Sequence, residues 1–94
     1  MEKLAAAQIE ERIKELPGWK FTGSSIATDL KFKDFKETFS VMTRIAFECE
    51  ALSHHPDWKN VYNQLHIALN THDVQGITDK DFELAHKIQN IISS

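Results

Sequence analysis

The amino-acid sequence predicts an α+β domain with the element order αββαββα, in which three helices cover one face of a four-stranded antiparallel sheet. The 94 residues fit a single domain spanning 1–94. Three segments place apolar residues at helical spacing, and two pairs of short segments alternate with the two-residue period of strands. Helices combined with hairpins favour an antiparallel sheet that has one covered face.

The first three elements follow from apolar spacing and turn residues. Residues 5–15 are rich in strong helix formers and place Ile9, Ile13 and Leu16 at helical intervals, and Pro17-Gly18 ends this helix. Segments 19–22 and 26–32 then form a hairpin around the turn at 23–25. The inward face of its second strand is expected to carry Ile26, Thr28, Leu30 and Phe32.

The longest helix is predicted to begin after Asp34, which is a good N-cap and has Glu37 three residues later. Pro56 disfavours helical geometry at His55, so the helix should end near Ser53 or His54. One apolar stripe runs along this helix, and we expect all of it to belong to the core. Its members are Phe35, Phe39, Met42, Ile45, Ala46, Cys49 and Leu52.

The second hairpin is predicted over 58–64 and 65–71, followed by a loop at 73–77 and a last helix over 79–92. Thr78 should cap this helix, because Thr78-x-x-Asp81 is a capping-box arrangement. The fourth strand should turn Leu65, Ile67 and Leu69 to the core, and His66, Ala68, Asn70 and His72 to the other face. That open face is expected to lie against another subunit or a ligand.

The composition narrows the class of protein. The net charge is −3 with both signs interspersed, so the basic surface typical of nucleic-acid binding is missing. Cys49 is the only cysteine, which rules out an internal disulfide and favours a reducing, cytoplasmic location. We expect Cys49 to be a small buried residue. Neither a secretory signal nor a membrane-spanning run is predicted.

Histidines concentrate around the adjacent pair His54-His55 and at His72. Imidazole, with an unperturbed pKa of about 6.5, can give and take protons at neutral pH. The three therefore suggest acid–base chemistry or a metal site. Neighbours on an extended chain point apart, and no cysteine or clear carboxylate completes a tetrahedral set, so acid–base chemistry is favoured over a metal. His66 and His86 are interpreted as structural and surface residues.

The spacing Glu50-x3-His54-His55-Pro56-x5-Tyr62-x9-His72-x8-Asp81 resembles that of the pterin-4a-carbinolamine dehydratases, also known as dimerisation cofactors of a hepatocyte homeodomain transcription factor. The resemblance extends over 19–92. It implies an α+β fold, no metal or cofactor, and loss of water from a 4a-hydroxytetrahydropterin to give the quinonoid dihydropterin. This reaction recycles the tetrahydrobiopterin that aromatic amino acid hydroxylases spend. Further matching segments are Lys33-Asp34-Phe35, Phe39-x-x-Met42-Thr43-Arg44 and Trp58-x-Asn60-Val61-Tyr62-Asn63.

The resemblance also implies roles for individual residues. His54 and His72 occupy the catalytic positions, one as acid and one as base, because the departing hydroxyl needs a proton and ring N5 must lose one. His55 also falls on a site position and is expected to help hold the pterin ring. Glu50 is expected to accept hydrogen bonds from the pterin or to tune a histidine.

Two further positions have competing interpretations. Asp81 is expected at the substrate site, where it orients His72, but it would also serve simply as a helix cap. Trp19 matches a family tryptophan that lies beside the pterin, where an aromatic face can stack on the ring, and a core position is equally compatible with the sequence.

The family forms dimers and tetramers, so a homodimer or homotetramer is expected here. No direct contact with nucleic acid or membrane is predicted. The alternative function is a non-catalytic binding module that stabilises dimers of a partner transcription factor. A hydroxylase is a further possible partner. The complete set of site residues favours the enzyme over the binding module.

Overall fold

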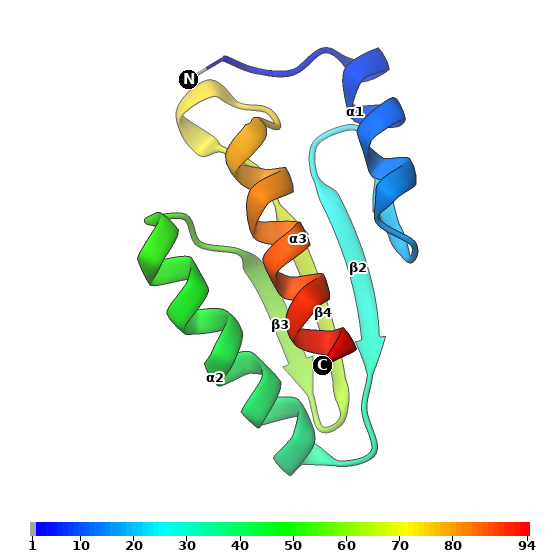
Figure 1. Ribbon diagram of the computed structural model, residues 1–94, viewed down its shortest axis with the longest axis vertical. Coiled ribbons are helices and arrows are strands. Elements are labelled where there is room, and N and C mark those ends of the chain that lie inside the picture. The colour runs from blue at the N-terminus through cyan, green and yellow to red at the C-terminus, as the bar shows by residue number, and fades with distance from the viewer. Residues whose placement is uncertain (1) are drawn as a thin grey trace.

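The computed structural model describes residues 2–94, and the order of its elements follows the prediction (Figure 1). The helical elements are α1 (Ala6–Arg12), the 3-10 turn η1 (Ile13–Glu15), α2 (Phe35–Leu52), the 3-10 turn η2 (His72–Val74) and α3 (Asp79–Ser93). The strands are β1 (Trp19–Phe21), β2 (Ile26–Lys31), β3 (Asp57–Val61) and β4 (Gln64–Leu69). None of the helices within 2–94 is long and apolar enough to cross a membrane.

The four strands form one antiparallel sheet in the order β1-β2-β4-β3. Alternation along β4 buries Leu65, Ile67 and Leu69 and leaves His66 exposed, so only one face of the sheet contributes to the core. The helices cover that face (Figure 1). The predicted fold class is confirmed.

The core lies between the sheet and the helices α2 and α3. Ile45 and Cys49 from α2 meet Leu84 and Ile88 from α3, and each of these side chains is buried. Burying an aliphatic side chain of this size stabilises the folded state by about 1.5–3 kcal/mol. This packing fixes the end of α2 against the start of α3, which is where the predicted site residues lie.

Both ends of α2 are closed by defined hydrogen bonds. At the start, Asp34 Oδ1 accepts from Glu37 N at 2.9 Å, as predicted, and Glu37 Oε1 reaches back to Lys33 N at 3.0 Å. At the end, Ser53 adopts a left-handed conformation (φ 52°), and His54 N–H donates to Cys49 O at 3.0 Å. The direction in which His54 leaves the helix is therefore fixed by main-chain bonding.

The second hairpin differs from the prediction in its bounds. Its turn is at Tyr62-Asn63, and Gln64 begins β4 instead of ending β3. The reason is local, because Asn60 Nδ2 donates to the carbonyls of both Tyr62 (3.0 Å) and Gln64 (2.8 Å) and so closes the turn there. At the other end β4 stops at Leu69. His72 consequently does not continue the strand's alternation but lies in η2.

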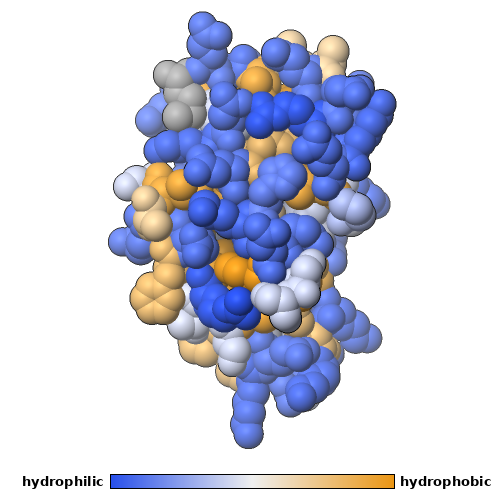
Figure 2. Space-filling view, viewed as in Figure 1, coloured by the Kyte–Doolittle hydropathy of each residue, from blue (hydrophilic) through white to orange (hydrophobic). Residues whose placement is uncertain are grey.

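The prediction that the whole apolar stripe of α2 is core was wrong. The inward face is centred on Thr38, Val41, Ile45 and Cys49, whereas Phe35 and Phe39 are 45% and 54% exposed. Thr38 can be buried because its hydroxyl donates to Asp34 O at 2.8 Å within the helix. Phe35 and Phe39 therefore form an apolar ridge on the outside of α2. Figure 2 shows apolar residues along the left edge of the molecule, where α2 lies.

Candidate active site

His54 and Asp81 form the central contact of the site. His54 follows the end of α2 and Asp81 lies in the first turn of α3, and the two are brought together across 27 positions of sequence. His54 Nε2 is 2.5 Å from Asp81 Oδ1. The His54 side chain is 10% exposed and that of Asp81 is 0% exposed. The imidazole is therefore held from the protein interior by a carboxylate that solvent does not reach.

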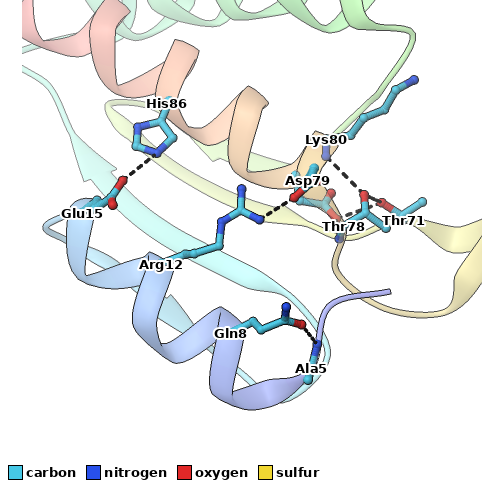
Figure 3. A network of polar contacts seen from close by, with 10 residues as sticks. Ala5, Gln8, Arg12, Glu15, Thr71, Thr78, Asp79, Lys80 and His86 are labelled. Atoms are coloured by element: carbon cyan, nitrogen blue, oxygen red, sulfur yellow. Dashed lines mark hydrogen bonds and ion pairs between the residues drawn. The ribbon is translucent and has the colours of Figure 1, made fainter. Parts of the chain in front are cut away.

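The buried Asp81 carboxylate has a full set of partners, as a buried charge requires. Besides His54, it accepts hydrogen bonds on Oδ2 from Thr78 N and from Thr71 Oγ1, each at 2.9 Å. Thr71 Oγ1 lies 2.8 Å from Thr78 Oγ1 (Figure 3). Since the single hydroxyl proton of Thr71 goes to Asp81, Thr78 must donate to Thr71. Asp81 thus acts both as a helix cap and as the anchor of His54.

This network determines which nitrogen of His54 faces solvent. An ionised carboxylate can only accept, so His54 Nε2 carries the proton that points to Asp81. Nδ1 of the neutral ring is then a proton acceptor. Among residues 2–94, Nδ1 has no hydrogen-bond partner, and it is not a buried unsatisfied atom, so it keeps contact with solvent. The exposed edge of His54 is equipped for proton transfer.

His72 lies at the same end of the molecule as His54 and Asp81, but it belongs to a different segment, the turn η2. It is exposed on η2 and directly follows Thr71, whose hydroxyl binds Asp81. The predicted partner of Asp81 was His72, but the carboxylate pairs with His54 instead. His72 is linked to Asp81 only through its neighbour Thr71.

His55 and Glu50 form a second pair on the outer side of the site. His55 Nε2 lies 2.7 Å from Glu50 Oε2, and both side chains are mostly exposed. Although they are neighbours in sequence, His54 is buried and His55 is exposed. Glu50 is thus in direct contact with a histidine, and the roles predicted for it at the site stay predictions.

The sequence pattern of the pterin 4 alpha carbinolamine dehydratase family matches residues 2–91 of this chain. The chain belongs to this dehydratase family. The resemblance drawn from the spacing of His54, His55, His72 and Asp81 is thereby confirmed.

Individual relatives agree with this assignment. The chain is 51% identical over 94 residues to a protein of Christiangramia forsetii, covering 100% of this chain and 97% of that protein. It is 48% identical over 89 residues to a protein of Sinorhizobium medicae, covering 93% and 85%. Both relatives have the provisional name pterin-4-alpha-carbinolamine dehydratase.

A solved structure confirms the dehydratase fold. The chain is similar to a crystal structure from Brucella melitensis described as a transcriptional coactivator/pterin dehydratase, with a TM-score of 0.92 and 36% sequence identity. The match covers 96% of this chain and 98% of that one.

Trp19 lies apart from the other residues that the dehydratase resemblance singled out. It is buried in the core, and its indole Nε1–H donates to Gln89 Oε1 at 3.1 Å. It belongs to β1, at the opposite edge of the sheet from β3, which follows His54-His55. Three strand spacings of about 4.8 Å separate those edges. Within one chain, the core interpretation of Trp19 is the one observed.

Sequence reasoning gave no role to Thr71 and Lys80 at the candidate site. The Thr71 hydroxyl binds Asp81, and Lys80 Nζ donates to Leu52 O at 3.0 Å, which ties the start of α3 to the end of α2. Thr78 was foreseen as a cap but not as a donor to Thr71. The position of Thr71 beside His72, and of Lys80 beside Asp81, was the available signal in the sequence.

The remaining ionisable groups lie outside this cluster. His66 pairs with Asp29 at 2.7 Å on the open sheet face, and His86 lies 3.8 Å from Glu15. Cys49 is buried beside the helix end, and desolvation raises the pKa of its thiol to about 11. Within 2–94, no group of three or more His, Cys, Asp or Glu side chains is placed to hold a metal ion.

Proposed function

We propose that this protein is a hydro-lyase that removes water from a 4a-hydroxytetrahydropterin and releases the quinonoid dihydropterin. The observation that carries this proposal is the His54–Asp81 pair, in which a fully buried carboxylate fixes an imidazole whose other nitrogen meets solvent. The provisional names of the relatives support the same reaction.

The reaction needs two proton transfers and no redox step. The bond between C4a and its hydroxyl breaks, and a general acid protonates the departing oxygen, so that it leaves as water. A general base takes the proton from N5, and a double bond forms between N5 and C4a. Positioned imidazoles that carry out such transfers contribute about 10²–10⁴-fold each to the rate.

We assign these two transfers to His54 and His72. Asp81 holds the His54 ring in one orientation and faces the charge that develops when the ring is protonated, as carboxylates do in histidine-based catalysis. Asp81 itself has no exposed atoms, so it is a positioning residue and does not touch substrate. His72 stands exposed on the neighbouring loop and supplies the second imidazole.

Glu50 and His55 are assigned to substrate binding. Their side chains are exposed and already oriented toward each other at 2.7 Å. The carboxylate of Glu50 can accept hydrogen bonds from the amino-pyrimidinone edge of a pterin while His55 holds its orientation. The substrate would then lie between this pair and the exposed edge of His54. In this role the protein recycles tetrahydrobiopterin for an aromatic amino acid hydroxylase in the cytoplasm.

We further propose that the chain acts as a homodimer or homotetramer. The apolar ridge of α2 exposes Phe35 and Phe39, whose rings lie 5.6 Å apart, and Phe47 is 71% exposed on the same helix. An apolar surface of this kind is typical of a protein–protein interface. The open edge of β3 offers unpaired main-chain groups as well.

The alternative function, a binding module for a transcription factor, is supported by the same ridge and by the description of the Brucella melitensis protein as a coactivator. The two functions are separable. A pulldown with a labelled amphipathic helix of the partner type would retain that helix only if the ridge is a binding surface, whereas a dehydration assay reports only on the site.

The decisive experiment measures the dehydration of enzymatically generated 4a-hydroxytetrahydropterin with the wild-type protein and with His54→Ala and His72→Ala. Each substitution should slow the reaction by about 100-fold or more, because it removes one proton-transfer group. His86→Ala is the matched control, since His86 is an exposed histidine on α3 outside the site. Folded wild-type protein that gives no acceleration would exclude the enzyme and favour the binding module.

A further inference from the structure

The residues before α1 cross the end of the molecule at which the site lies. Figure 1 shows this segment running from beside the loop before α3 to the start of α1. We call residues 2–5 the N-terminal strap. Leu4 N–H donates to Ile77 O at 2.7 Å, and the Leu4 side chain packs against the core. The strap is therefore bonded to the segment that leads into α3.

The strap also lies directly on Gly76. A β-carbon built at Gly76 would be 2.6 Å from Lys3 Cγ and closer still to Cδ, so the Lys3 side chain lies against the Gly76 backbone. Because Lys3 is exposed and its side chain is flexible, it can move aside for a larger residue at this position. The main-chain bond between Leu4 and Ile77 is therefore the contact that fixes the strap to this segment.

Gly76 is the far end of the loop that carries His72. Thr71 N–H donates to Gly76 O at 2.7 Å, and Gly76 N–H donates to Thr71 O at 3.3 Å. Within this closed loop, Thr71 binds Asp81 and His72 follows it immediately. A continuous set of contacts thus joins Lys3 and Leu4 to the loop and to the carboxylate that holds His54.

The helix that follows the strap is anchored to the start of α3. Arg12, at the end of α1, forms an ion pair with Asp79 at 2.5 Å (Figure 3). Its guanidinium also lies 4.5 Å from the centre of the Phe82 ring. Ala5 N–H donates to Gln8 Oε1 at 2.8 Å, which fixes the corner between strap and helix. The strap is consequently fixed to Ile77 through Leu4 and to α1 through Ala5, while α1 itself is tied to the start of α3.

We propose that the N-terminal strap is a positioning element for the dehydration, and that its contacts with Gly76 and Ile77 hold His72 at the site. This inference rests on the function proposed above. The strap touches neither Glu50 nor His55, so its loss should lower kcat and leave KM nearly unchanged.

The test removes the main-chain bond between Leu4 and Ile77. Leu4→Pro has no N–H donor and should lower kcat by roughly tenfold or more, because small misplacements of a catalytic group are costly. Leu4→Ala keeps the N–H donor and should retain kcat within about twofold of the wild type, although it loses side-chain packing. Equal kcat values for the folded Leu4→Pro and Leu4→Ala variants would overturn the role of the strap.

Two further variants separate positioning from general stability. Deletion of residues 2–4 should lower kcat at least as much as Leu4→Pro, because it removes the same bond to Ile77. Gly23→Ala is the control, since Gly23 has φ +97° in the β1–β2 turn and open space around it. This variant should lower the melting temperature but leave the kcat of the folded protein unchanged. Unaltered kcat after the deletion would contradict the proposal.

Hydrogen exchange provides a readout that does not depend on activity. The amides of Val74, Gln75 and Gly76 are bonded within the loop and should exchange faster, by at least fivefold, when residues 2–4 are removed. The amide of Ile45, in the middle of α2, should not change. Unchanged exchange in the loop would overturn the strap inference. Faster exchange in a protein that lacks any dehydratase activity would instead refute only the catalytic function.

Discussion

At the scale of single residues, the site depends on Asp81. Its carboxylate is fully buried and joins three segments of chain: the His54 ring, the Thr71 hydroxyl and the Thr78 main chain. Because one oxygen of the carboxylate orients an imidazole and the other caps α3, stability and proton transfer are coupled at this position. Substitutions here should affect both properties.

Asp81→Asn tests this coupling. The amide is the same size, but one acceptor oxygen becomes an N–H donor, so either a partner loses its bond or the proton of His54 must move from Nε2 to Nδ1. We expect a loss of about 1–3 kcal/mol in the free energy of unfolding, together with a clear fall in kcat. Asp79→Asn is the control, because Asp79 is exposed in the same helical turn and surface ion pairs contribute about 0–1 kcal/mol. Equal effects of the two variants on kcat would contradict the assigned role.

Cys49 gives a second prediction at this scale. Burial raises the pKa of its thiol from 9.0 to about 11, so at pH 8 the folded protein has roughly 100-fold less thiolate than the unfolded chain. Labelling by iodoacetamide should be slower by at least that factor. The folded state keeps the thiol proton between pH 9 and 11, so this group's contribution to stability decreases as the pH rises through that interval. Rapid labelling of native protein at pH 8 would contradict the burial.

At the scale of the elements, the sequence predicts the structure correctly wherever residues close together in the chain determine it. The N-cap at Asp34, the end of α2 at Ser53 and the capping box of α3 follow from residue types and were correctly predicted. The turn at Tyr62-Asn63 depends on the side chain of Asn60 bonding two carbonyls, which apolar alternation does not reveal. The pairing of His54 with Asp81 needs the packing of α2 against α3, so spacing identified both residues but not their contact.

The cap of α2 gives a prediction at this scale. Asp34→Ala removes the acceptor for Glu37 N–H, so we expect a loss of about 0.5–2 kcal/mol. In a domain of this size that corresponds to a melting temperature lower by roughly 4–8 °C per kcal/mol. Asp34→Asn keeps an acceptor oxygen and should remain close to the wild type. If thermal denaturation shows equal losses for both variants, the side-chain cap contributes nothing.

At the scale of the whole molecule, the fold separates the candidate active site from the apolar ridge of α2. The site lies where the end of α2 meets the start of α3, whereas Phe35 and Phe39 lie at the start of α2. Because these two rings lie at the opposite end of α2 from the site, self-association through Phe35 and Phe39 would leave the site open. This separation allows the two properties to be tested independently.

Phe39→Asp should shift a dimer or tetramer toward the monomer, because it places a charge in an apolar interface. Sedimentation velocity measures the change, and circular dichroism confirms that the fold is kept. Ser40→Asp is the matched control, since it adds the same charge at an exposed position on another side of α2. A wild-type protein that sediments as a monomer at micromolar concentration would exclude the proposed assembly.

The main-chain bond of the strap has a consequence for comparing relatives. Leu4 contributes a backbone N–H, so evolution can exchange the residue at this position for any other except proline without losing the bond to Ile77. The strap can therefore persist through extensive drift of the N-terminal sequence. It can also disappear through a short truncation that leaves every histidine in place. A relative of that kind would retain the full motif while its His72 loop had lost this support.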